Sequence, residues 1–470
     1  MIFRPHNLIK SENNFIFYGE VNAIAHPCLN KDIIKEFWRN FSFGCSTLNV
    51  SECDKFIFSI GNTKALPLDG ADYSINIDEG GVCVCAENEK NLIYGFVTLL
   101  DRFSGVDRED SLAVKLDCCQ IKESPLIKNR MVHFCVFPET ELWVLKRFVR
   151  FCGALKFTHI VLEFWGMLKY DCMNELAWSF AFTKEQIRPI INEANDLGLE
   201  IIPMFNHWGH ASACRICSGK HVVLDQNHSL QTYFTDDGWC WDIRKPKVKD
   251  LLRKIRKELT ELFEGGRYIH LGCDEAYNFE LNKENMDFIC GFINEISEEM
   301  KQVGRKIIIW GDIFLYRHPD YNSDNKYTCN APSQFVEQYL LEHLSKDVVI
   351  ADWQYSATSY PIETSDVFTK AGFDCLLCPW DRGEAQMYAC LDTVKNSSLM
   401  GIMHTTWHTI QGHGYTFVLR TAAGCFESPV PLTNREARTA AASLLRKVMP
   451  SNGDYEKSGS LKFQITHKSP

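Results

Sequence analysis

Several features that would assign a chain of 470 residues to a particular class are missing from this sequence. No apolar run approaches the roughly 18 residues that a membrane-spanning helix needs. Positive charge is not in excess: the net charge is −10, so neither nucleic acid nor an anionic membrane surface is an expected partner. No glycine-rich phosphate-binding loop follows any early predicted strand, which argues against a dinucleotide-binding fold.

We also expect no export signal. The first seven residues, MIFRPHN, lack the basic and then apolar pattern of a secretory signal peptide. The chain contains 20 cysteines, and without an export signal we expect free thiols in a reducing compartment, which means a cytoplasmic protein. With 45% hydrophobic and 23% charged residues, it has the composition of an ordinary globular protein that is long enough for two domains.

The first 125 residues are predicted to form a small α+β domain. Residues 72–86 contain two alternating apolar runs joined by Gly80-Gly81, which predicts a hairpin. Further strands are expected at 55–61 and 111–118, with a helix at 89–103. The region of Pro125 marks the predicted boundary, so that the domains span 1–125 and 126–450, followed by a polar tail at 451–470.

A regular alternation of strands and helices follows Pro125. Eight short β-rich runs occur, at Arg130–Val136, His159–Phe164, Glu200–Asn206, Tyr268–Cys273, Lys306–Trp310, Val348–Trp353, Phe373–Cys378 and Gly401–Thr406. The helical segments between them include Glu141–Leu155, Lys184–Leu197, Pro246–Leu262, Asn285–Val303 and Gln334–Leu344. This alternation predicts a parallel sheet, and a count of eight favours a closed (β/α)8 TIM barrel over an open doubly wound sheet.

Two adjacent carboxylates, Asp274 and Glu275, end the fourth of these runs, in the segment RYIHLGCDEAY (267–277). Because side chains alternate across a strand, neighbours can serve one site only where the strand ends. The carboxyl end of a barrel strand is where catalytic groups lie, and paired carboxylates in different environments are suited to breaking a glycosidic bond. A second copy of the pair, Asp78-Glu79, precedes the hairpin turn and is interpreted as ordinary surface charge.

Tryptophans recur at four other predicted strand ends: Trp310, Trp353, Trp380 and Trp407. This repeated position is hard to attribute to core filling, because each indole N–H needs a partner. A pocket with aromatic walls, with acids and Arg130 at its floor, would suit a pyranose ring, which has apolar faces and hydroxyl edges.

These motifs together resemble glycoside hydrolase family 20, the β-N-acetylhexosaminidases. The segment HLGCDE (270–275) matches the family's His-x-Gly-x-Asp-Glu motif, and IPMFNHWGH (202–210) resembles its third-strand motif. Arg130 resembles the arginine of the family's first strand. The segment 72–103 resembles the family's smaller domain. The resemblance thus implies a TIM barrel preceded by a small α+β domain.

The resemblance implies a mechanism as well. Glu275 would protonate the leaving oxygen and then activate water, and the substrate's own 2-acetamido oxygen would attack the anomeric carbon. Asp274 would orient that amide. His210 would lie behind Glu275. Substrate-binding roles are implied for Arg130, His210, Trp310, Trp353, Trp380, Asp381 and Trp407. The expected partner is an oligosaccharide or glycoconjugate with a terminal N-acetylhexosamine; no cofactor, metal, nucleic acid or membrane is expected, and no particular oligomeric state is predicted.

The chain departs from the family pattern at two positions. Larger members have an Asp-Asp pair after the second strand that backs the histidine, whereas this chain has LEFWGMLKY (162–170), so that acid is either absent or replaced by Glu163. Where the family often has Trp-x-Glu after the eighth strand, this chain has Trp407-His408-Thr409, so the glutamate's contact with the sugar's outer hydroxyls is lost or altered. Three hypotheses therefore stand: an exo-β-N-acetylhexosaminidase acting on terminal GlcNAc or GalNAc, a family member with altered amino-sugar specificity, and a non-catalytic glycan-binding barrel. The intact acid pair argues against the third.

Metal-like cysteine spacing occurs in one loop. Cys214 and Cys217, followed by His221, have the spacing of zinc ligands, but no second matched pair lies near them in the sequence. We therefore expect no metal in that loop.

Overall fold

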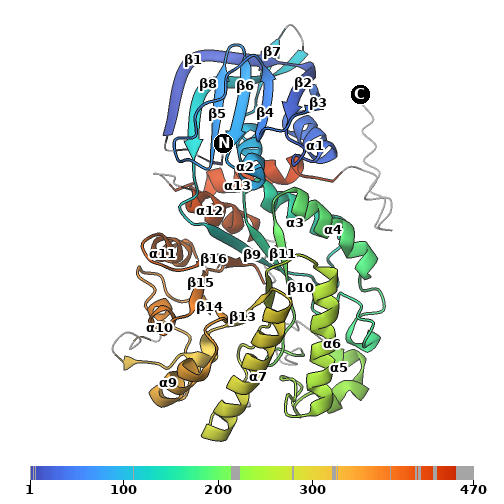
Figure 1. Ribbon diagram of the computed structural model, residues 1–470, viewed down its shortest axis with the longest axis vertical. Helices are drawn as coiled ribbons and strands as arrows, with labels where there is room; N and C mark the ends of the chain where they lie inside the picture. The colour runs from blue at the N-terminus through green and yellow to red at the C-terminus, as the bar shows by residue number, and fades with distance from the viewer. Residues whose placement is uncertain are drawn as a thin grey trace.

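The computed structural model describes residues 2–3, 5, 7–108, 111–212, 223–277, 280–319, 324, 326–381, 383–407, 410, 414–426 and 431–450. A sheet domain, drawn in blue and cyan, is stacked on a barrel that continues through green to red (Figure 1). The sheet ends at Glu123 and the barrel's first strand begins at Asn129, on either side of Pro125.

The N-terminal domain is an eight-stranded sheet in the order β1-β8-β5-β6-β4-β2-β3, with β7 paired to β8. Its strands are β1 (Asn7–Phe17), β2 (Gly19–Ala25), β3 (Ser46–Glu52), β4 (Ile57–Gly61), β5 (Tyr73–Asp78), β6 (Gly81–Ala86), β7 (Ser104–Arg108) and β8 (Ser111–Glu123). The predicted hairpin is β5–β6. Only β2 and β3 pair in parallel, and α1 (Lys31–Phe41) connects them.

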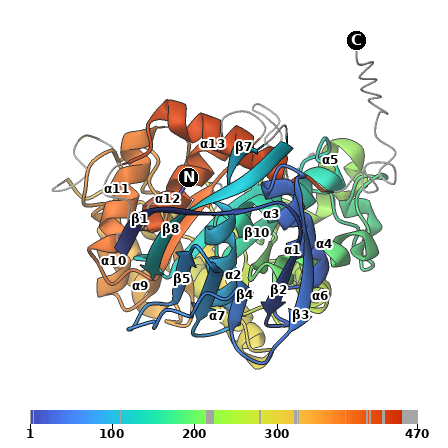
Figure 2. The same ribbon diagram turned by 90° about the horizontal axis from the view of Figure 1, so that it is seen from above.

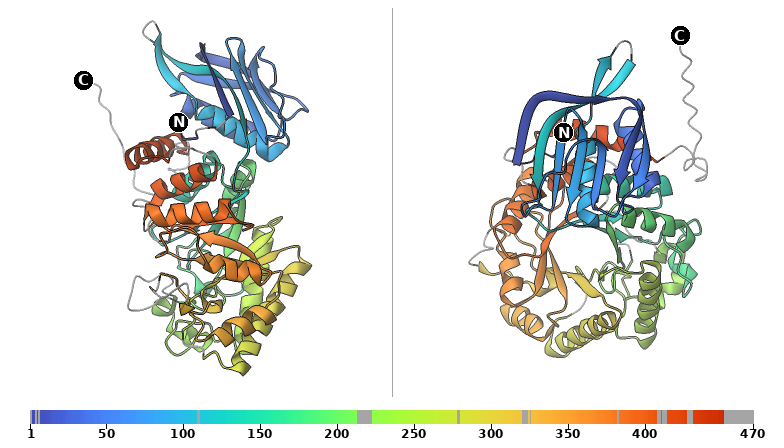
Figure 3. Two further views of the ribbon diagram at one scale, coloured as in Figure 1. Left: turned by 90° about the vertical axis from the view of Figure 1, so that its left-hand side faces the viewer. Right: turned by 45° about the horizontal axis from the view of Figure 1, so that its top comes forward.

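Helix α2 (Glu89–Leu100) lies between the sheet and the barrel. It packs on β5 and β6 and also contacts α3 (Leu142–Ala154) of the barrel, and every residue from Asn91 to Leu100 is buried. A helix that is apolar all round requires such covering on all sides. Figure 2 looks down on the sheet, which covers one side of the barrel, and Figure 3 shows the same stacking from two other directions.

The second domain is a closed parallel barrel of eight strands, as predicted. Its strands are β9 (Asn129–Cys135), β10 (His159–Glu163), β11 (Glu200–Met204), β12 (Tyr268–His270), β13 (Lys306–Trp310), β14 (Val349–Trp353), β15 (Asp374–Cys378) and β16 (Gly401–Thr405). Strand β9 pairs with both β10 and β16, which closes the barrel. The predicted runs are confirmed, but β12 is only three residues long.

Helices surround the barrel. The longer ones are α3, α4 (Lys184–Asp196), α6 (Pro246–Leu262), α7 (Lys283–Gln302), α9 (Gln334–His343), α11 (Glu384–Lys395), α12 (Tyr415–Cys425) and α13 (Asn434–Lys447). The shorter elements are α5 (Val223–Gln226), α10 (Thr364–Lys370), η1 (Asn174–Leu176), η2 (His228–Tyr233) and η3 (Asp312–Phe314). Local signals set their ends: Thr183 and Gln186 form a capping box at α4, and Pro246 occupies the first turn of α6.

The barrel interior is filled by side chains and is not a pore. Met131, Val161, Ile202, Ile308 and Val349 belong to an apolar cluster inside it. Tryptophans, histidines and acids lie at the carboxyl ends of the strands, above this packed layer. The fold therefore offers polar chemistry at one end of the barrel, where TIM-barrel enzymes carry it.

No helix within the described residues is long and apolar enough to cross a membrane. Every cysteine in the described ranges is a free thiol. Cys214, Cys217, His221 and His408, as well as the predicted tail at 451–470, lie outside the described residues.

Candidate active site

Left-handed backbone conformations mark the carboxyl end of the barrel. Trp165 follows β10 with φ 38°, His210 follows β11 with φ 53°, and Trp407 follows β16 with φ 43°. After β12, Cys273 has φ 72° and Glu275 has φ 52°. Non-glycine residues rarely adopt positive φ, and such strain concentrates at functional sites. The candidate site therefore lies at this end of the barrel.

The two adjacent carboxylates occupy different environments. Asp274 is buried, with 4% of its surface exposed, whereas 26% of the Glu275 side chain is exposed. His210 Nε2 lies 2.8 Å from Glu275 Oε2 and 3.4 Å from Asp274 Oδ2. The Tyr277 hydroxyl donates to Glu275 Oε1 at 2.6 Å. Glu275 is thus the carboxyl group that can meet a ligand, and a histidine and a phenol hydroxyl contact its two oxygens.

Two glycines bring the loops of this site together. A Cβ atom on Gly209 would lie 1.8 Å from the carbonyl oxygen of Asp274, and one on Gly272 would lie 1.8 Å from Asn206 Oδ1. Gly272 also has φ +67°. Because only glycine permits these approaches, the glycines of both sequence motifs hold the acid pair against the loop that carries His210.

Asp312, which sequence reasoning did not include among the site residues, organises the acid pair from the next strand. Its Oδ2 accepts the backbone N–H of Glu275 at 3.0 Å and the Asn330 amide at 2.7 Å. Its Oδ1 accepts the indole N–H of Trp353 at 3.3 Å. Burial raises the pKa of Asp312 to about 6. Its position directly after Trp310-Gly311 at the end of β13 was the available signal.

Tyr355 contacts three of the four tryptophans, a role that sequence reasoning also missed. Its hydroxyl accepts the Trp407 indole N–H at 2.9 Å, and its ring lies 5.1 Å from the rings of both Trp353 and Trp380. The Trp310 and Trp407 rings are 5.7 Å apart. Trp310 is fully buried, whereas Trp353 and Trp380 are half-buried. The structure therefore brings the predicted tryptophans together, with Trp310 as the buried base of the group.

Asp381 and Glu163 also lie at this end of the barrel. Asp381 is buried immediately after Trp380. Glu163 Oε1 accepts the Asn206 amide at 2.6 Å, and the other carboxylate oxygen faces His133. Glu163 and His210 line the same small cavity of about 20 Å³. The predicted role of Glu163 as the acid behind His210 stays a prediction.

Arg130 is not part of this cluster, which corrects the expectation that it floors the sugar site. It lies at the beginning of β9, where its guanidinium donates to the main-chain carbonyls of Ile127, Lys128 and Lys156. Its charge lies over the Phe426 ring, 4.9 Å from the centroid. Residues on β9 alternate between the barrel interior and the helices, and Arg130 falls on the helix side.

A family model described as "Glycosyl hydrolase family 20, catalytic domain" matches residues 162–383. The matched part runs from β10 to the residues that follow β15, and it includes His210, Asp274, Glu275 and Asp381.

Individual relatives are distant. The chain is 21% identical over 269 residues to a lacto-N-biosidase of Bifidobacterium bifidum, covering 53% of this chain and 23% of that protein. It is 22% identical over 291 residues to a β-hexosaminidase of Porphyromonas gingivalis, covering 54% of this chain and 37% of that protein. The chain thus spans less than half the length of these curated relatives.

Solved structures share the fold over nearly the whole chain. A family 20 exo-β-N-acetylglucosaminidase from Vibrio harveyi, determined with N-acetylglucosamine, superposes with a TM-score of 0.66 at 15% identity. The superposition covers 96% of this chain and 77% of that one. At such low identity this likeness establishes the arrangement of sheet domain and barrel.

Proposed function

We propose that the chain, whose residues 162–383 match the catalytic-domain model of glycosyl hydrolase family 20, is an exo-β-N-acetylhexosaminidase of that family. Its substrate would be an oligosaccharide or glycoconjugate with a terminal, non-reducing, β-linked N-acetylglucosamine or N-acetylgalactosamine. The observation that carries this proposal is the acid pair at the end of β12. There, the buried Asp274 and the more exposed Glu275 both face His210.

In the proposed reaction, Glu275 moves the proton. Its carboxyl group protonates the glycosidic oxygen as that bond breaks, and its carboxylate then takes a proton from the attacking water. His210 and Tyr277 contact its two oxygens at 2.8 and 2.6 Å, so they fix its orientation. The backbone N–H of Glu275 is held by Asp312, which fixes the main chain as well.

Asp274 would support attack by the substrate itself. The 2-acetamido oxygen displaces the leaving group from the anomeric carbon and forms an oxazolinium-like ring, and water then opens this ring with net retention. Such an intramolecular step has a high effective molarity. A carboxylate that is 4% exposed is little screened by water, so Asp274 can orient the amide N–H and offset the developing positive charge.

The tryptophan group would bind the sugar ring. Trp353 and Trp380 are half-buried and lie on the same tyrosine ring, so they offer aromatic surface beside the acid pair. Trp407 is tied to that tyrosine by its indole N–H and packs on Trp310. Apolar sugar faces stack on such surfaces, while the hydroxyl edges take the polar groups.

Asp274→Asn tests the substrate-assisted step. Asparagine keeps the shape of the side chain but removes its charge, so kcat on an aryl β-N-acetylglucosaminide should fall by roughly 10²–10³, with KM little changed or lower. A thiazoline mimic of the cyclised intermediate should inhibit the native protein tightly and the variant far less. Asp78→Asn, in the surface copy of the dipeptide, is the matched control and should leave kcat unchanged. Labelling of a carboxylate by a mechanism-based fluorosugar, with no thiazoline inhibition, would contradict the proposal.

Glu275→Gln tests the proton donor. The loss in turnover should be on the order of 10²–10⁴-fold for substrates with poor leaving groups, because they need the proton. Aryl substrates with acidic leaving groups should lose less in the first step. Glu79→Gln is the control. Equal losses across leaving groups would mean that Glu275 is not the acid.

A second candidate is a family member with altered amino-sugar specificity. Arg130, expected to hold the sugar's outer hydroxyls, points away from the site, and Glu163 faces His133 and Asn206. Neither side chain would then hold the sugar's outer hydroxyls, while the acid pair is intact, so sugar recognition can differ without loss of catalysis. Comparing kcat/KM on aryl GlcNAc, GalNAc and glucosamine substrates separates the two candidates. Binding of these sugars without turnover of any would instead indicate a non-catalytic glycan-binding barrel.

We also propose a cytoplasmic location. The free thiols of all described cysteines support it, because a reducing compartment keeps them unpaired. Fractionation of the native cells tests it, and recovery of the protein in a secreted fraction would contradict it.

A further inference from the structure

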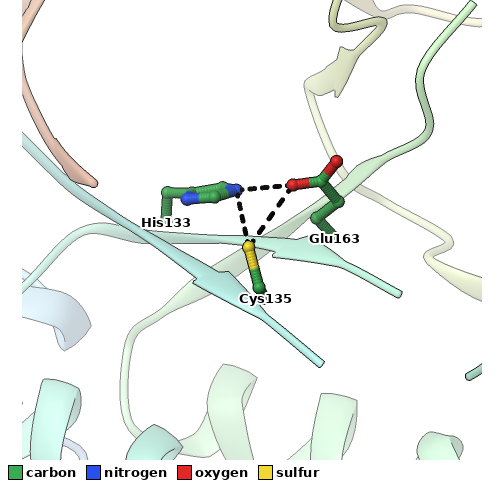
Figure 4. Close-up of side chains that lie close together, drawn as sticks. All are labelled: His133, Cys135 and Glu163. Carbon is green, nitrogen blue, oxygen red and sulfur yellow. Dashed lines mark hydrogen bonds and ion pairs between the residues drawn. The ribbon is translucent and has the colours of Figure 1, made fainter. Parts of the chain in front are cut away.

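Three side chains with metal-binding atoms meet inside the barrel, outside the acid pair. His133 and Cys135 are two residues apart on β9, so they point to the same side of the strand. Cys135 pairs in register with Glu163 on β10, which brings that carboxylate to the same side. All three are buried. Figure 4 shows them pointing toward one another.

The nitrogen, sulfur and oxygen atoms of these three side chains lie close to one another. His133 Nε2 lies 3.1 Å from Glu163 Oε2 and 3.7 Å from Cys135 Sγ, and the sulfur lies 3.5 Å from the same carboxylate oxygen. A Cys-His-acid relay would use one ring nitrogen for the thiol and the other for the acid. Here one nitrogen faces both groups. The arrangement is therefore that of converging ligands and not of a nucleophile with its base.

These three distances match the edges of a tetrahedral zinc site. Zinc bonds of about 2.3 Å to sulfur and about 2.0–2.1 Å to nitrogen and oxygen, at tetrahedral angles, separate the ligand atoms by about 3.3–3.6 Å. The observed separations bracket that range. We propose that His133 Nε2, Cys135 Sγ and Glu163 Oε2 bind a divalent transition metal of the zinc class, joining β9 to β10.

The donor set selects this class of metal. Calcium and magnesium prefer six or more oxygen ligands, whereas a thiolate, an imidazole and a carboxylate together suit zinc. The charges of the ligands also favour a divalent cation. A thiolate and a carboxylate buried together would repel each other, and a divalent cation with a neutral imidazole gives a site of zero net charge, which burial penalises least.

The surroundings support the ligands. Asn206 donates to the other oxygen of Glu163 at 2.6 Å, so the carboxylate is oriented from outside the site. The His133 ring packs edge-on to Trp407, with ring centroids 4.7 Å apart. A cavity of about 20 Å³, with room for about one water, lies on the Asn206 side of Glu163. The metal would thus hold the His133 ring in place against Trp407.

No metal was expected from the sequence, because the ligands of this site have no local spacing signal. Its ligands come from two strands, whereas the zinc-like spacing of the sequence lies at Cys214 and Cys217. Those two cysteines are therefore the principal alternative source of any metal that the protein holds, and the test includes them.

The experiment measures metal in the full chain. After removal of metal by a chelator and reloading with Zn²⁺, the native protein should hold about one zinc per chain. Reloading with Co²⁺ should produce a thiolate-to-cobalt charge-transfer band. Cys135→Ser should abolish that band, and Glu163→Gln should weaken zinc affinity on the order of 100-fold. Cys378→Ser, another buried thiol inside the barrel, is the matched control and should retain both metal and band.

The outcomes decide between the sites. Failure of the native protein to retain zinc, or a cobalt spectrum without the charge-transfer band, overturns the proposal without use of any variant. So does loss of metal in a Cys214→Ser/Cys217→Ser variant combined with its retention in Cys135→Ser. Near-ultraviolet circular dichroism identifies variants that have not folded; if Cys135→Ser is among them, Glu163→Gln and the native cobalt spectrum decide the question. The result is independent of hexosaminidase activity.

Discussion

At the scale of single residues, the position of Arg130 on the helix-facing side of β9 determines which groups its guanidinium contacts. Its donors are taken by carbonyls at the beginning of β9, and its guanidinium packs against Tyr94 and Phe426. Arg130→Met should therefore lower the unfolding free energy by about 2–4 kcal/mol, because buried carbonyls lose their donors.

Urea unfolding and steady-state kinetics check this prediction on the same samples. KM should stay within about twofold of the native value, because Arg130 lies outside the sugar site. A larger change in KM would report the loss of binding that is uniform in the ground and transition states. Arg188→Met, on the exposed side of α4, is the control and should change neither quantity. A raised KM with unchanged stability would show instead that Arg130 binds the sugar.

Asp312 provides a pH-dependent prediction at the same scale. Its folded pKa, about 6, lies above the ordinary aspartate value of 3.8 because the group is buried. Between these pH values the folded state therefore holds more protons than the unfolded chain, so Asp312 makes the unfolding free energy fall as pH rises. Relative to native protein, Asp312→Asn should gain stability from about pH 4 to about pH 6. It should lose turnover, because asparagine has one acceptor oxygen for the three N–H groups of Glu275, Asn330 and Trp353 that the two carboxylate oxygens accept. A pH-independent difference between the two unfolding free energies would contradict this.

At the scale of elements, the contact between the loops after β11 and β12 leaves no room for an added side-chain atom. Gly209→Ala would place a Cβ atom 1.8 Å from the Asp274 carbonyl oxygen, so the acid pair must move. Since small displacements of reacting groups are costly, kcat should fall on the order of 100-fold. Gly291→Ala is the matched control: it lies in α7 with nothing within 4 Å of an added Cβ. It should raise stability by about 0.5–1 kcal/mol and leave kcat unchanged. Equal kcat values in both variants would contradict the loop argument.

The barrel strands were predictable from sequence because parallel strands, covered on both faces, read as continuous apolar runs such as KIIIW in β13. The outer strands of the first domain were not. Strand β1, NLIKSENNFIF, is mostly exposed and carries polar residues on both faces. The residues of the candidate site also differ in whether they could be predicted from the sequence. Asp274 and Glu275 are recognisable as neighbours in the sequence, whereas Asp312 and Tyr355 act through contacts between strands, which the register of the sheet sets and the sequence does not encode locally.

At the scale of the whole molecule, a buried lysine joins the two domains. Lys156 Nζ, fully buried before β10, donates to Glu123 at 2.7 Å, Tyr73 at 2.9 Å and Thr98 at 3.1 Å, all in the sheet domain. Burial lowers its pKa to about 8. Lys156→Met should cost about 3–5 kcal/mol, because Glu123 is left as an uncompensated buried charge.

The double variant Lys156→Met/Glu123→Gln should recover a large part of that loss, and urea unfolding of the four proteins of the cycle measures the coupling. Additive losses would mean that the pair does not join the domains. Because both domains depend on this contact, we expect a single unfolding transition in the native protein.

The pairing of β9 with β16 closes the barrel by joining strands that lie at opposite ends of its sequence, Asn129 beside Gly401. During synthesis, every earlier strand can find its neighbour as soon as both have left the ribosome. Strand β9 can pair with β10 early, but its other edge must wait for β16, the last strand of the barrel to be made. Until then the nascent protein carries two open parallel edges, which are templates for pairing with other chains. Chaperone dependence and losses during expression should therefore arise from the last strand to emerge.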